Sequence, residues 1–147
     1  MFHWIASHHI LLYAVALSAI FAFWKGGWPE RAGGFANFVL TGVYMGAKVY
    51  LPPIMWPTTE LAIDCVLSFT FLGLALRFGS RWLGAAMLLQ AGQFSLHAYY
   101  FVSERRPDLF YAMVNNVVSW GVVLCITAGV IATWGRNARA ARAQRPA

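Results

Sequence analysis

Long apolar segments, separated by short polar or helix-breaking stretches, dominate the pattern along the chain. A helix needs about 20 mostly apolar residues to cross the hydrocarbon core of a bilayer. Four segments reach that length, at residues 4–24, 58–77, 81–103 and 109–134. A fifth, shorter segment runs from Phe35 to Tyr50, carries Lys48 near its end and is soon followed by two prolines, which stop a helix. The pattern predicts an all-α polytopic membrane helix bundle with five transmembrane helices, or four if this short segment does not cross.

Two of the expected helices begin with capping residues. Thr58 follows Pro57 and precedes Glu60, so an N-cap at Thr58 is expected, with an acid in the first turn to offset the helix dipole. Asp108 is expected to cap the last helix in the same way.

Composition indicates a surface that faces lipid. The 147-residue chain is 60% apolar and only 11% charged, against roughly 25% charged residues in soluble domains. A domain of this size buries only about two-thirds of the surface that its unfolded chain exposes. The remaining apolar surface has to face lipid, so we expect an integral membrane protein. It is divided into a transmembrane bundle over residues 1–135 and a basic cytoplasmic tail over residues 136–147.

Positive charges indicate the orientation, because Lys and Arg concentrate on the cytoplasmic side of membrane proteins. With five crossings and the tail inside, eight positive residues are cytoplasmic: Lys25, Arg31, Arg77, Arg81, Arg136, Arg139, Arg142 and Arg145. Three are outside: Lys48, Arg105 and Arg106. With four crossings the split would be six against five. Five helices are therefore expected, with the N-terminus outside and the C-terminus inside.

The two ends of the chain have simple interpretations. No Lys or Arg precedes Lys25, so the first helix lacks the positive region of a signal peptide and is expected to stay uncleaved. The tail from Arg136 holds four arginines, no acid and no aromatic residue. It is interpreted as an anchor on anionic lipid rather than as a nucleic-acid-binding or partner-binding arm, so no nucleic-acid partner is expected.

Polar residues of the fourth segment fall on one helical face. Gln90, Gln93, His97 and Tyr100 follow one another at steps of three, four and three residues, which places them in one narrow arc at about 3.6 residues per turn. Lipid offers such groups no hydrogen-bond partner, at a cost of several kcal/mol for each. The face is therefore expected to turn toward other helices.

Further polar residues are expected at the same depth. The last two helices share a short connection, so His97 should lie level with two neighbouring asparagines across this hairpin, with Ser119 one turn deeper. Asp64 carries a carboxyl group, which is expensive inside a membrane, and it is placed in the same outer half. The candidate binding cluster comprises Asp64, Gln90, Gln93, His97, Tyr100, Asn115, Asn116 and Ser119. The inner half is expected to carry almost no ionisable side chain.

Small residues indicate where helices approach closely. Gly42 and Gly46 form a GxxxG pair, a spacing that lets backbones approach in membranes. Cys65 and Cys125 belong to different segments and different expected depths, so they are interpreted as small packed side chains without a disulfide. No zinc-type spacing of Cys and His occurs, and no metal site is expected.

The polar cluster admits three functional interpretations. The first is a non-enzymatic structural or accessory membrane subunit without a cofactor, in which polar groups hold helices together within a complex or a homo-oligomer. The second is a cytochrome-like redox protein that holds haem between His97 and either His8 or His9. The third is a small proton or solute transporter that uses Asp64 and His97. An enzyme is not expected, because the chain has no HExxH or GxSxG motif.

The run "RFGSRWLGAAMLLQAGQFSLHAYY" has a short basic turn with Trp, followed by a helix that bears Gln and His. In this plan, from about Thr59 to Gly129, the chain resembles small multi-pass bacterial membrane proteins. The resemblance implies five helices and a bacterial inner membrane, and it implies no activity. Of the three interpretations, the structural or accessory subunit is the one expected.

Overall fold

The computed structural model describes residues 2–144, with side chains from residue 10 onward. Within this range the chain forms five α-helices and one 3₁₀ helix: α1 (Phe2–Lys25), α2 (Trp28–Tyr50), η1 (Pro53–Met55), α3 (Trp56–Phe78), α4 (Arg81–Val102) and α5 (Leu109–Ala143). No β-strand occurs among these residues. The predicted all-α class is confirmed.

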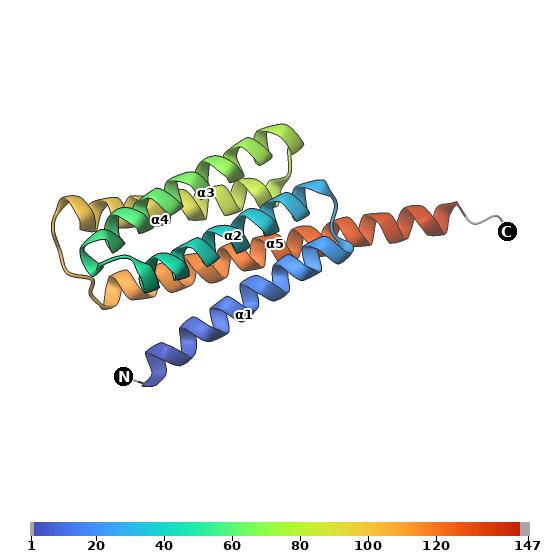
Figure 1. The fold of residues 1–147 in the computed structure, drawn as a ribbon. Coiled ribbons are helices and arrows are strands. Elements are labelled where there is room, and N and C mark those ends of the chain that lie inside the picture. Colours follow the sequence, from blue (N-terminus) through green and yellow to red (C-terminus); the bar gives the residue numbers. More distant parts are fainter. Residues whose placement is uncertain (1, 145–147) are drawn as a thin grey trace.

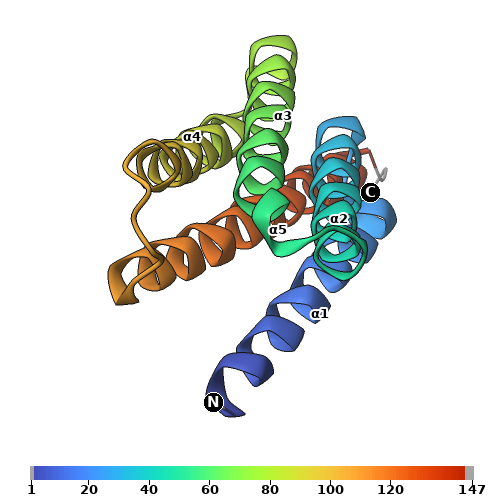
Figure 2. The ribbon, with the colours of Figure 1, turned by 60° about the vertical axis from the view of Figure 1, so that its left-hand side comes forward.

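Successive α-helices run in opposite directions along the bundle, with turns at its two ends (Figure 1). α5 contacts α1, α2 and α4, while α3 contacts α2 and α4, so α5 runs through the middle of the arrangement (Figure 2). One end of the bundle, called here the η1 end, holds η1 and the α4–α5 loop. The opposite end, called the Gly79 end, holds the α1–α2 and α3–α4 turns.

α2 is longer than the sequence pattern predicted. It begins at Trp28 instead of Phe35, because Pro29 and Glu30 occupy its first turn, where proline is tolerated and an acid offsets the helix dipole. Its 23 residues extend about 34 Å at 1.5 Å per residue. The helix lies lengthwise against α1 and α3 (Figure 2), and it has the length that a bilayer crossing requires.

The ends of α3 and α5 test the capping predictions. Asp108 caps α5 as predicted, since its Oδ1 accepts the backbone N–H of Tyr111 at 2.9 Å. Thr58 does not cap α3, because the chain enters through η1 and the helix already begins at Trp56. α5 continues to Ala143, so the described part of the basic tail is helical and projects beyond the other helices at the Gly79 end (Figure 1).

Apolar side chains fill the interior of the bundle and also cover its outside. Phe71, Leu83, Ile126 and Val130 form the fully buried centre. Exposed large apolar side chains occur on every α-helix, among them Leu17, Phe35, Phe69, Leu88 and Leu124. Two helical segments, Pro53–Phe78 and Leu109–Ala143, are long and apolar enough by length and composition to cross a membrane.

Glycines permit close contacts, but not at the GxxxG pair that the sequence suggested. A Cβ atom added at Gly42 or Gly46 would meet nothing within 4 Å, so this pair brings no two helices of the described chain together. A Cβ atom at Gly129 of α5 would lie 2.6 Å from the indole of Trp82 on α4. The indole of Trp82 packs over Gly129, and Leu89 packs in the same way over Gly121, where an added Cβ would lie 2.8 Å from it. Both glycines let α4 and α5 approach closely.

Replacing Gly129 by alanine is expected to lower the free energy of unfolding by about 1–3 kcal/mol, the usual cost of overpacking. The ring of Trp82 cannot move away freely, because its Nε1–H donates to Glu30 Oε1 at 3.2 Å. Unfolding by SDS in mixed micelles would measure the change. Gly84→Ala is the matched control on α4, where a new Cβ meets nothing within 4 Å. Equal stability of the two variants would contradict the close packing of Trp82 on Gly129.

Candidate functional site

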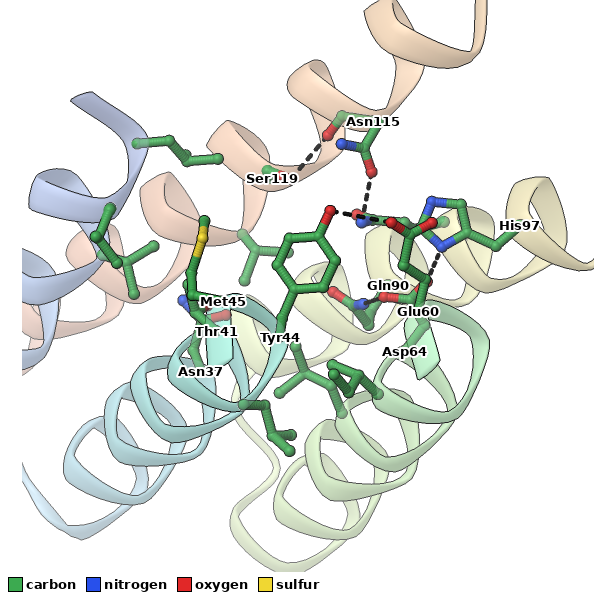
Figure 3. A pocket seen from close by; sticks show the side chains of 18 of the residues that line it. Asn37, Thr41, Tyr44, Met45, Glu60, Asp64, Gln90, His97, Asn115 and Ser119 are labelled. Atoms are coloured by element: carbon green, nitrogen blue, oxygen red, sulfur yellow. Dashed lines mark hydrogen bonds and ion pairs between the residues drawn. The ribbon is translucent and has the colours of Figure 1, made fainter. Parts of the chain in front are cut away.

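A polar cavity of about 110 Å³ lies inside the bundle, toward the η1 end. Side chains from all five α-helices line it (Figure 3). Its polar lining residues are Asn37, Thr41, Tyr44, Glu60, Asp64, Gln90, Gln93, His97, Asn115, Asn116 and Ser119. A cavity needs a polar lining to hold water or a polar ligand, and this one has it.

Asp64 on α3 joins two residues of α4 (Figure 3). Its Oδ1 accepts a hydrogen bond from Gln90 Nε2 at 2.7 Å, and its Oδ2 contacts His97 Nδ1. All three side chains are buried. The partners stand at positions 90 and 97, two helical turns apart, so they reach the two oxygens of one carboxyl group from the same face of α4.

Glu60 lies one turn before Asp64 and gathers residues of α2 and α5. Its Oε1 accepts the Tyr44 hydroxyl at 3.0 Å and lies 3.3 Å from Lys48 Nζ. Its Oε2 accepts the Tyr111 hydroxyl at 2.8 Å. The Tyr111 ring in turn stacks on the imidazole of His97, with 5.2 Å between ring centroids. The two carboxyl groups therefore belong to one connected polar assembly.

Amide groups complete the lining between α4, α5 and α2. Gln93 Nε2 donates to Asn115 Oδ1 at 2.9 Å, and Ser119 Oγ donates to the backbone carbonyl of Asn115 at 2.8 Å. Asn37 and Asn116 also line the cavity, and their side chains have no hydrogen-bond partner among the described residues. The cavity thus keeps unused donors and acceptors.

A second pocket of about 240 Å³, called here the loop pocket, lies beside the α4–α5 loop. It shares Glu60 and His97 with the polar cavity, so these two side chains form the wall between the two spaces. Tyr100 lines the loop pocket, and its hydroxyl donates to Asp108 Oδ1 at 2.7 Å. The hydrogen bonds from the Tyr111 backbone and the Tyr100 hydroxyl hold the pKa of Asp108 below its ordinary value.

Seven of the eight residues proposed from the sequence line one cavity, and Tyr100 lies outside it, in the loop pocket. The polar faces of α4 and α5 meet across the hairpin, as their matched depth predicted, but His97 takes no part in this hydrogen bond. The imidazole turns to Asp64 of α3, and Gln93 meets Asn115 instead. The helical register explains the difference, because positions 90 and 97 of α4 share the side that packs on α3.

Several lining residues were missed in the sequence. The sequence analysis did not single out Tyr44 and Tyr111, although each hydroxyl donates to Glu60. It gave Glu60 only a role in the first turn of its helix, whereas this residue lines the cavity. Its four-residue spacing from Asp64 was the available signal, since residues four apart share a helix face. Asn37 gave a weaker signal, a single amide in an apolar run.

A buried carboxyl group also lies near the Gly79 end, which corrects the expectation of an inner half almost without ionisable side chains. Glu30 is 2% exposed. Its Oε1 accepts from Trp82 Nε1 at 3.2 Å and from Thr133 Oγ1 at 3.0 Å, and its Oε2 accepts from the Gly27 backbone at 2.9 Å. The residue was overlooked because α2 was expected to start at Phe35, which lies after Glu30 in the sequence. Both oxygens of Glu30 have partners, so this group ties α2, α4 and α5 together.

No group of three or more His, Cys, Asp and Glu side chains in the described part of the chain could hold a metal ion. Cys65 and Cys125 are free thiols. For the haem hypothesis, the side chains of His8 and His9 lie outside the described residues, so the structure places neither of them relative to His97. A cavity of about 110 Å³ is also far smaller than the roughly 300–1,000 Å³ of ordinary cofactor pockets.

Comparison of the chain with protein-family models, curated proteins and solved structures found no match. Function therefore has to be inferred from the geometry and chemistry of the polar cavity.

Proposed function

We propose that this protein is a non-enzymatic bacterial inner-membrane protein with five crossings that binds a small polar molecule from the extracytoplasmic side. The single observation that carries this proposal is the polar cavity, which combines a buried carboxyl–imidazole pair with amide groups that the described side chains satisfy only in part.

Five crossings are supported by the arrangement of the helices and charges. α2 lies lengthwise in the bundle instead of along one end (Figure 2), and each α-helix exposes large apolar side chains. Because the helix directions alternate, the described members of the predicted cytoplasmic set of positive residues lie at or beyond the Gly79 end. The three positive residues predicted outside lie at the η1 end. The Gly79 end is then cytoplasmic, by the positive-inside bias.

Binding is favoured over purely structural hydrogen bonding because the cavity has more polar capacity than its own contacts use. Interhelical hydrogen bonds are enough to explain why Gln90, Gln93 and Asn115 are polar. They leave the Asn37 amide, on a side chain that is 6% exposed, without a hydrogen-bond partner among the described residues, although Asn37 lines the cavity. A buried polar group without a partner costs about 1–3 kcal/mol, which a bound water or solute would offset.

Binding is also favoured over passage through the bundle. The apolar core lies between the polar cavity and the Glu30 network, as the order of residues along α3 and α5 shows. Phe71 follows Asp64 by two turns on α3, and Ile126 precedes Thr133 by two turns on α5. Both core side chains are fully buried, so an apolar layer separates the two carboxyl networks among the described residues.

Aqueous access can be tested by Ag⁺ reaction with a cysteine at Ser119, in a background where Cys65 and Cys125 are alanine. We expect Ag⁺ added outside intact spheroplasts to protect Ser119→Cys from later maleimide labelling under denaturing conditions, because the side chain lines the cavity. The matched control is Ala86→Cys in the fully buried apolar core, which should react at least tenfold more slowly.

Orientation is read from the same experiment with Arg139→Cys, on the exposed end of α5. This cysteine should be protected only when Ag⁺ reaches the cytoplasmic face in inverted vesicles. Protection of Arg139→Cys from outside would contradict the orientation, and equal rates at positions 119 and 86 would contradict a water-accessible cavity.

A further inference from the structure

We propose that the polar cavity takes a small uncharged molecule that carries a carboxamide-type group, and that it discriminates against cations and anions of the same shape. This inference rests on the proposed function, since it names the class of molecule bound at that site.

The charges in the cavity wall already have partners. Glu60 lies 3.3 Å from Lys48 Nζ and accepts two tyrosine hydroxyls. Asp64 faces His97, and both are buried. Burial in apolar surroundings disfavours a net charge on such a pair. A charged ligand would enter without a free counter-charge and would lose its hydration, whereas a neutral ligand avoids this cost.

The hydrogen-bonding groups that remain on the cavity wall include several amides, together with the Nε2 of His97. Asn37 and Asn116 have no side-chain partner among the described residues, and Gln90, Gln93 and Asn115 each use only part of their capacity. An amide offers both a carbonyl acceptor and two N–H donors. A lining with this balance best fits a ligand that also presents a carbonyl and an amino group.

The size of the cavity limits the ligand. Its volume of about 110 Å³ corresponds to roughly four water molecules at about 30 Å³ each. A molecule with about four non-hydrogen atoms therefore fills it, and a nucleotide, a sugar or haem does not. Acetamide has this size and chemistry. Acetate and acetamidinium have the same shape with a negative and a positive charge, so the three form a matched series.

The test is saturation-transfer NMR on the methyl protons of acetamide, acetate and acetamidinium, with the intact protein in nanodiscs of deuterated lipid. We expect acetamide to bind with a dissociation constant at least tenfold lower than either ion. The Asn37→Leu variant should weaken acetamide binding about tenfold, because it replaces the unpartnered amide by an apolar group of similar size. Asn137→Leu, on the exposed end of α5, is the control and should leave binding unchanged.

The variant Asn37→Leu is expected to fold, since the amide that it removes has no hydrogen-bond partner among the described residues. Its SDS unfolding midpoint would be measured alongside. If it unfolds more easily, Asn116→Leu provides the same comparison from α5. If acetate or acetamidinium bound more tightly than acetamide, the inference of a neutral ligand would be overturned, whereas the proposed binding function would stand. If none of the three probes bound, the inference would also be overturned. The Ag⁺ reaction of Ser119→Cys would then show separately whether the cavity is accessible to water.

Discussion

Replacing Asp64 by alanine is expected to lower the free energy of unfolding by about 3–5 kcal/mol, the usual effect of removing one partner from a buried ionisable pair. The variant leaves His97 Nδ1 and Gln90 Nε2 without their acceptor, and both side chains are buried. SDS unfolding in mixed micelles would measure the loss.

Two further variants distinguish the loss of the Asp64–His97 contact from a general disruption of α3. Ser68→Ala removes a buried hydroxyl that has no partner, one turn from Asp64, and should be neutral or slightly stabilising. The double variant Asp64→Leu, His97→Leu should recover most of the loss, because buried pairs can be replaced by apolar residues at little cost. A loss for the double variant as large as that for Asp64→Ala would mean that the pair itself is not the source of the effect.

Replacing Glu30 by alanine should cost a similar amount, about 3–5 kcal/mol, since hydrogen bonds to charged groups contribute about 1.5–3 kcal/mol each and are not fully additive. The change leaves Trp82 Nε1, Thr133 Oγ1 and the Gly27 backbone N–H without their acceptor. Glu30→Gln keeps one carbonyl oxygen and should lose about half as much. The same unfolding assay applies.

A double-mutant cycle tests whether Glu30 acts through Trp82. Trp82→Phe removes the indole N–H and retains an aromatic ring against Gly129. If Glu30 stabilises the bundle through this bond, the two changes together should cost less than the sum of the single changes. Strict additivity would contradict the coupling.

The helical class and the polar face of α4 could be predicted from the pattern of residues. An apolar segment of about 20 residues can cross lipid only as a helix or as part of a closed barrel. The ends of four α-helices were therefore predicted to within a few residues, apart from the C-terminal end of α5, which continues beyond the predicted segment. Gln90, Gln93, His97 and Tyr100 share a face because helical periodicity depends only on spacing. Asp108 was recognised as an N-cap because capping is also local.

The partners of these residues could not be predicted in the same way. Spacing along α4 does not show that its polar face meets both α3 and α5, with Gln90 and His97 turned to Asp64 and Gln93 turned to Asn115. Glu30 was missed because a charged residue beside Gly and Pro reads as part of a loop. Only the packing of α2 against its neighbours buries that carboxyl group and brings Trp82 and Thr133 to it.

The sequence by itself therefore determined what depends on neighbours along the chain: helices, their polar faces and the excess of positive charge toward one end. The tertiary structure alone decided which faces meet, that Asp64 and Glu60 belong to one cavity wall, and that Glu30 holds the opposite end together. The physical reason is that helical periodicity is a local property of the backbone. Hydrogen bonds between helices depend on rotations and offsets that the packing of the whole bundle sets.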